Sequence, residues 1–109
     1  MHELSITRNI VAIVTERARD AKVLRIKLEI GKLSAIMPDA VRFCFDIVAK
    51  GTVADGAVLE IHEIPGRGQC RNCHKEMLLE QLFAYCECGS NEIDRIAGEE
   101  LKIKEMEVD

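Results

Sequence analysis

The sequence predicts an α+β fold in which two helices pack on a three-stranded sheet and a small cysteine-rich module is inserted before the last strand. Three observations predict it. Apolar residues recur at helical spacing in two segments, they alternate with a period of two in three others, and four cysteines gather within residues 70–88. The length of 109 residues suits one small domain that carries such a module.

The first helix is predicted over residues 4–20, and a strand follows it. An apolar stripe with helical spacing runs along the helix through Leu4, Ile10, Val11, Val14 and Ala18. The chain then changes to alternation over residues 23–30, where the apolar side consists of Leu24, Ile26, Leu28 and Ile30. This alternation predicts a half-buried strand that ends at Gly31.

The second helix is predicted to begin at Pro38 and to end near Ala49. Proline is favoured in the first turn of a helix, and Gly51 is a typical residue just beyond a helix end. Two further strands are predicted over residues 58–64 and 101–108. In this second helix, Val41, Phe45 and Val48 are expected to be buried. In the strand over residues 101–108, the residues expected to be buried are Leu101, Ile103, Met106 and Val108.

Glycine and proline bracket the cysteine cluster on both sides. We therefore expect a main lobe of residues 1–66 plus 97–109 and a separate module of residues 67–96. Short linkers are expected at residues 65–68 and 96–98, because glycine and proline punctuate regular structure.

The charge distribution bears on the class of partner. The net charge is −4, and no segment is basic overall, which argues against a nucleic-acid surface. The longest stretch free of charged residues, Asn9 to Thr15, has seven residues, far short of the about 20 apolar residues of a membrane span. With no secretory signal pattern at the start, we expect a cytoplasmic protein.

The cysteines are spaced Cys-x2-Cys and Cys-x-Cys. Two such pairs on tight turns can place four thiolates around one tetrahedral zinc ion, with zinc–sulfur distances of about 2.3 Å. We therefore predict a zinc-ribbon-like module with a structural zinc site formed by Cys70, Cys73, Cys86 and Cys88. Zinc contributes about 10–16 kcal/mol of apparent binding energy in small zinc modules, which would offset the small apolar burial here.

Alternatives for the cluster remain, because the second pair is one residue shorter than a standard zinc knuckle. His74 can replace one thiolate, an iron–sulfur cluster also takes four cysteines, and Cys86 with Cys88 can form a redox dithiol. One side of the site is expected to be covered by the apolar residues Met77, Leu78, Leu79, Leu82, Phe83 and Tyr85. The fifth cysteine, Cys44, is expected to be a small buried side chain.

The chain begins Met1-His2-Glu3, which offers a chelate for one metal ion. The α-amine, the backbone nitrogen and imidazole of His2, and the backbone nitrogen of Glu3 can supply four donors in one plane. Such a plane suits nickel(II) or copper(II). Because His2 is bulky, we expect Met1 to be retained. Taken alone, a histidine in second position is usually an ordinary exposed residue, and the same holds for His62 on a strand.

Taken together, these features resemble the HypA/HybF family of nickel metallochaperones over essentially the full chain. The resemblance lies in residues 1–6, 30–34, 38–45 and 104–108 and in the four clustered cysteines. One departure stands out, since the family's second pair is generally Cys-x2-Cys and here it is Cys86-Glu87-Cys88.

The resemblance implies a two-lobed α+β protein that carries Ni(II) as cargo for the maturation of [NiFe]-hydrogenase, and for urease in some relatives. It implies that His2 binds nickel together with the backbone of Met1 and Glu3, and that the four cysteines hold zinc. The implied partners are the GTPase HypB and the large subunit of the hydrogenase.

Two other classes of function compete with this interpretation. A zinc ribbon with Arg67, Arg71 and Lys75 around its first cysteine pair can bind nucleic acid, although interleaved aromatic residues are lacking. A redox enzyme using the Cys86-Glu87-Cys88 segment lacks an accompanying catalytic set. We therefore expect no enzyme activity, no nucleic-acid partner and no membrane partner. The inserted module permits a homodimer, including a domain-swapped form.

Overall fold

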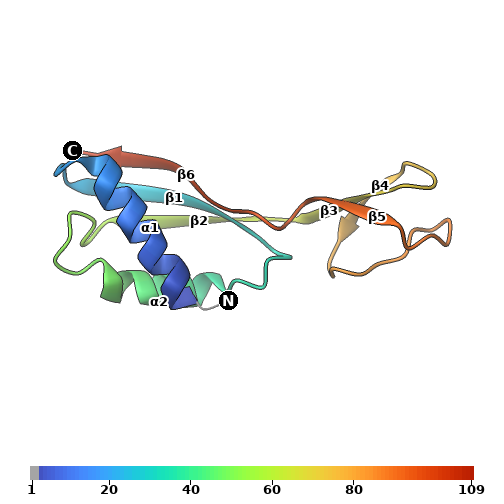
Figure 1. The fold of residues 1–109 in the computed structure, drawn as a ribbon, viewed down its shortest axis with the longest axis horizontal. Coiled ribbons are helices and arrows are strands. Elements are labelled where there is room, and N and C mark those ends of the chain that lie inside the picture. Colours follow the sequence, from blue (N-terminus) through green and yellow to red (C-terminus); the bar gives the residue numbers. More distant parts are fainter. Residues whose placement is uncertain (1–2) are drawn as a thin grey trace. The chain divides into compact units, whose positions relative to one another are not determined.

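The computed structural model describes residues 3–109, which form two compact units (Figure 1). The larger unit consists of the chain up to Glu29, Ile36–His62 and Lys102–Asp109, and the smaller one consists of Ile30–Ala35 and Glu63–Leu101. The elements in chain order are α1 (Glu3–Ala18), β1 (Val23–Gly31), α2 (Pro38–Val48), β2 (Val58–Ile64), β3 (Gly66–Cys70), β4 (Glu76–Leu79), β5 (Ile93–Ala97) and β6 (Leu101–Val108).

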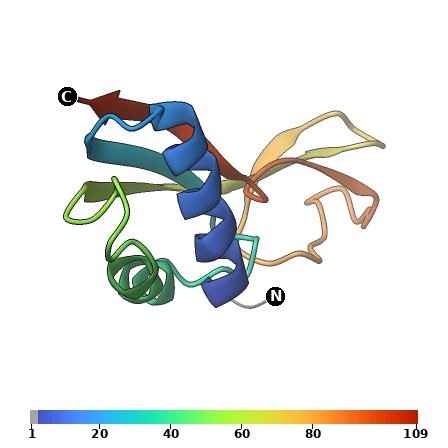
Figure 2. The same ribbon diagram turned by 60° about the vertical axis from the view of Figure 1, so that its left-hand side comes forward.

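The larger unit is a helix-on-sheet structure. Its three strands follow the order β2-β1-β6, so the first strand of the chain is central and the last one forms an edge. Both views show α1 running across this sheet, with α2 nearby (Figures 1 and 2). The core between the layers is aliphatic apart from Phe45, and its most deeply buried side chains include Val14, Ile26, Leu28 and Val41. The predicted helix pair and three-stranded sheet are thus confirmed.

Some details of the predicted burial were wrong. In α1 the buried face includes Ile6 and Thr7, whereas Leu4 is 40% exposed. Thr7 is accommodated there because its hydroxyl donates to the backbone carbonyl of Glu3 at 2.6 Å. In β6, the first and last residues, Leu101 and Val108, are exposed, whereas Ile103 and Met106 between them are half-buried.

The smaller unit has a sheet of its own, with the order β4-β3-β5 and antiparallel pairing throughout. The prediction of linkers at residues 65–68 and 96–98 is wrong for most of these residues, because they lie in strands. Strand β3 begins at Gly66 and β5 runs to Ala97, with Arg67 opposite Ala97 in the register. Cross-strand pairing satisfies the backbone groups of these residues, so glycine here marks close packing of strands and not a flexible connection.

The smaller unit also extends beyond the predicted module of residues 67–96. The backbone N–H of Gly31 donates to the carbonyl of Glu100 at 2.7 Å, and that of Leu33 donates to Gly98 at 2.7 Å. A Cβ at Gly31 would lie 1.9 Å from the carbonyl oxygen of Gly98, so this close approach requires glycine. Residues 30–35 are therefore held to the segment that precedes β6.

No helix within residues 3–109 is long and apolar enough to cross a membrane.

Candidate metal centre

The four clustered cysteines lie on two tight turns of the smaller unit. The first turn joins β3 to β4, and the backbone N–H of Cys70 donates to the carbonyl of Lys75 at 2.9 Å. The second turn lies before β5, and the N–H of Cys86 donates to the carbonyl of Ser90 at 2.8 Å. We call these turns the first knuckle (residues 70–75) and the second knuckle (residues 86–90). Each knuckle contributes one buried and one exposed cysteine.

The sulfur atoms are spaced as one central ion requires. All four lie within 4.8 Å of one another, and the distances are 3.7 Å between Cys70 and Cys88 and 3.5 Å between Cys73 and Cys86. Four sulfurs about 2.3 Å from a tetrahedral ion lie roughly 3.8 Å apart. Both short distances join one knuckle to the other, as expected around a shared ion. The spacing therefore fits zinc and is too narrow for a multi-iron cluster.

The turn geometry explains how the short second pair reaches the site. Gly89, directly after Cys88, has a φ of +92°, a conformation that glycine adopts without strain. His74 takes the same place after Cys73 in the first knuckle, with a φ of +63°. Within the described residues the ligand cluster consists of the four cysteines and does not include His74. This arrangement favours a backbone role for His74 over the role of a substitute ligand.

His74→Gly is expected to leave the zinc content at one ion per chain and not to lower the melting temperature. A left-handed conformation costs a non-glycine residue about 1–2 kcal/mol, and glycine removes that cost at the expense of unfolded-state entropy. Elemental analysis and thermal denaturation check both points. Loss of zinc in this variant would identify His74 as a ligand.

Hydrogen bonds and burial shift the pKa values of the clustered thiols in opposite directions. Donation by the backbone N–H of Ser90, with the side-chain amide of Asn72, lowers the pKa of Cys88 to about 6. The N–H of Cys88 lowers the pKa of Cys86, but burial and hydrogen bonds with neighbouring thiols outweigh it and raise that pKa to about 12. Zinc must displace the proton of Cys86 to bind all four sulfurs, so uptake releases protons.

The basic residues near the first knuckle pair with acidic partners of the same unit. Arg71 pairs with Asp94 at 2.7 Å, Lys75 pairs with Glu87 at 2.7 Å, and Arg67 pairs with Glu76. The Asp94 carboxylate raises the pKa of Arg71, and the Glu87 carboxylate raises that of Lys75. These local pairs neutralise the charges on which a nucleic-acid surface would depend.

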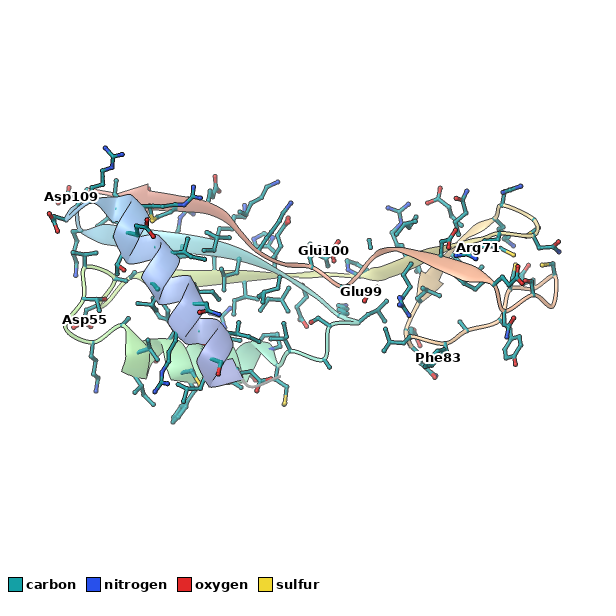
Figure 3. All side chains as sticks on the ribbon, in the orientation of Figure 1. Asp55, Arg71, Phe83, Glu99, Glu100 and Asp109 are labelled. Atoms are coloured by element: carbon teal, nitrogen blue, oxygen red, sulfur yellow. The ribbon has the colours of Figure 1, made fainter. Side chains whose placement is uncertain are left out.

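The apolar loop does not cover the site as predicted. Leu79 is buried, but Leu78, Phe83 and Tyr85 are largely exposed, and Phe83 reaches 87%. Figure 3 shows the Phe83 side chain directed away from the loop. The strands of the small sheet bury Leu79 because it lies opposite Gly66 in the β3–β4 register. The loop beyond β4 has no second layer to pack against.

The proposed nickel ligand and its neighbour, His2 and Met1, lie outside the described residues. Glu3, the first residue of α1, places its carboxylate at the start of α2, where Oε2 accepts from the backbone N–H of Met37 at 3.2 Å. The negative charge there also favours the positive end of α2. Sequence reasoning missed this contact, because no local pattern shows which helix start a carboxylate reaches.

Two further residues considered in the sequence, Cys44 and His62, do not belong to the ligand cluster. Cys44 in α2 is half-buried and distant in sequence from the cysteine cluster, and it is absent from that ligand group. His62 in β2 is exposed, as its default interpretation expected.

Comparison with known proteins gives one consistent answer. The family model described as "Hydrogenase/urease nickel incorporation, metallochaperone, hypA" matches residues 1–108. The chain is 65% identical over 109 residues to "Hydrogenase maturation factor HypA" of Nostoc punctiforme, covering 100% of this chain and 96% of that one.

Solved structures agree. "Solution structure of HypA protein" has a TM-score of 0.74 at 25% identity and covers 99% of this chain and 96% of that one. "Solution structure of the Ni metallochaperone HypA from Helicobacter pylori" has a TM-score of 0.71, also at 25% identity, and covers 99% and 97%. The chain belongs to the HypA family of hydrogenase and urease nickel-incorporation metallochaperones.

Proposed function

We propose that this protein binds Ni(II) at its N-terminus and delivers it during maturation of [NiFe]-hydrogenase, with zinc held by the four cysteines. The observation that carries the nickel proposal is the opening Met1-His2-Glu3 in a chain of this family. The α-amine, the imidazole of His2 and backbone nitrogens of His2 and Glu3 are the donors. Urease is a second candidate client.

One of the proposed donors, the backbone nitrogen of Glu3, belongs to the described part of the chain. The chain enters α1 at Glu3, and the contact from its carboxylate to the backbone of Met37 ties that first residue to the start of α2. Glu3, whose backbone nitrogen is one of the proposed donors, is therefore anchored at the start of α2. A site made of a chain terminus and one imidazole can be dismantled one donor at a time, which suits transfer of the ion to an acceptor.

Protons compete with nickel for the donors of such a site, so its affinity for nickel depends on pH. The α-amine, the imidazole and the backbone amides must all lose protons to bind nickel, so affinity falls as the pH falls. The zinc site has four thiolates and no open position, which is typical of a structural site. We assign to zinc the folding of the smaller unit and to the terminus the handling of cargo.

The proposed partners are the GTPase HypB, which would supply or accept nickel, and the hydrogenase large subunit as the client. A homodimer, including a domain-swapped form, is compatible with a smaller unit that is inserted in the chain. The proposed place of action is the cytoplasm.

The function is tested in cells from which the gene has been deleted. Untagged wild-type protein is expected to restore [NiFe]-hydrogenase activity and the nickel content of the large subunit, and His2→Ala is expected to restore neither. Excess nickel in the medium should partly rescue His2→Ala by mass action, because delivery and not assembly is impaired. Full activity with His2→Ala at low nickel would contradict the proposal.

A further inference from the structure

Backbone N–H groups donate to sulfur in both knuckles, but they are distributed differently over the cysteines. In the first knuckle, the backbone N–H groups of Cys73 and Asn72 both donate to the sulfur of Cys70. In the second, where one residue in place of two separates the cysteines, the N–H of Cys88 donates to the sulfur of Cys86 and the N–H of Ser90 donates to the sulfur of Cys88. A Cys-x2-Cys turn offers two successive N–H groups after its first cysteine, and a Cys-x-Cys turn brings its second ligand one residue sooner. The first cysteine of the short knuckle, Cys86, thus has one backbone donor, whereas the first cysteine of the other knuckle, Cys70, has two.

A side chain from the other knuckle supplies a donor. The Nδ2 of Asn72 lies 3.6 Å from the Sγ of Cys88, across 16 residues of chain. A thiolate only accepts hydrogen bonds, so the NH₂ end of the amide is the end that faces it. Asn72 is exposed, so its side chain contributes to this contact and not to core packing.

We propose that Asn72 is a positioning residue for the metal of the four-cysteine site, through its amide hydrogen bond to the thiolate of Cys88. The inference rests on the proposed zinc site. Four thiolates and one Zn²⁺ carry a net charge of −2, so an N–H group aimed at one sulfur offsets charge and orients that ligand. The bond also ties the second knuckle to the first.

A salt bridge also joins the two knuckles, but it does not involve a ligand sulfur. Lys75 and Glu87 pair at 2.7 Å, and both side chains are more than half exposed. Such surface pairs contribute little to stability. Their contact ends on a carboxylate and does not donate to a ligand sulfur. The assignment of Asn72 therefore depends on donation to sulfur and not on bridging alone.

The test compares Asn72→Ala and Asn72→Asp with Asn91→Ala, a matched change at an exposed asparagine of the same unit. Zinc affinity is measured on the full chain by competition with a chromophoric chelator. Asn72→Ala is expected to weaken zinc binding by about tenfold, as loss of an outer hydrogen bond to a ligand commonly does. Asn72→Asp should weaken it further, because a carboxylate near the site repels the thiolates. Asn91→Ala should match wild type.

A spectroscopic readout separates sulfur donation from general loosening. With Co(II) in place of zinc, loss of a hydrogen bond to sulfur makes the thiolate easier to oxidise, so the sulfur-to-cobalt charge-transfer band moves to longer wavelength. This shift is expected in Asn72→Ala and not in Asn91→Ala. Unchanged affinity and spectrum in Asn72→Ala, or equal effects of Ala and Asp, would overturn the inference. If wild-type protein takes up no zinc, the proposed zinc site itself fails.

Discussion

Acetylation of the N-terminus is expected to abolish the high-affinity nickel site and to leave the zinc content and the fold unchanged. The α-amine is one of the four proposed donors, and it anchors the ion while the backbone amides lose their protons. Acetylation turns this amine into a further amide, whose proton is held far more tightly than that of an ammonium group, so the chelate loses its anchoring donor. His2→Ala should have the same effect, because it removes the imidazole. Nickel titration of purified, untagged protein checks both, and the bound ion should be yellow and diamagnetic, as low-spin square-planar nickel is.

Two substitutions of Glu3 provide the controls. Glu3→Gln keeps the backbone nitrogen, and its amide oxygen can still accept from the N–H of Met37, so nickel binding should remain close to wild type. Glu3→Ala also keeps the backbone nitrogen but removes the contact, which is expected to cost about 1 kcal/mol of stability, the usual value for a helix cap. Full nickel affinity in acetylated protein, or a paramagnetic six-coordinate ion, would contradict the planar model.

Cys70→Ala is expected to lose zinc and to unfold the smaller unit while the larger one stays folded. Zinc contributes about 10–16 kcal/mol of apparent binding energy in small modules, far more than the burial of Leu79 and its few neighbours can replace. The core of the larger unit, including Ile26 and Val41, contains none of the four ligands. Elemental analysis and hydrogen exchange resolved by segment check this expectation.

Cys44→Ala is the matched control, because it removes a thiol outside the cluster. It should retain one zinc per chain and normal exchange in Glu63–Leu101. Retention of zinc by Cys70→Ala, or protection of its smaller unit without metal, would contradict the structural role. Iron and sulfide in the wild-type protein would contradict the identity of the metal.

The sequence by itself determined the helices and strands of the larger unit, because their patterns are local. Alternation over residues 23–30 requires one buried face whatever strand lies beside it, and Pro38 starts a helix through the geometry of its own ring. The four cysteines could likewise be predicted as ligands from the sequence, because a metal site on two tight turns has a characteristic spacing of its cysteines. Local patterns gave a wrong prediction where the chain is rich in glycine. Residues 65–68 have the composition of a linker, but most of them form β3.

Only the tertiary structure decided the features that join residues far apart in sequence. It placed residues 30–35 with the smaller unit, left Leu101 exposed, and paired Arg71 with Asp94. It also brought the amide of Asn72 to the sulfur of Cys88. The physical reason is common to all of them: hydrogen bonds, ion pairs and burial depend on distance in space, which no periodicity or spacing along the chain contains.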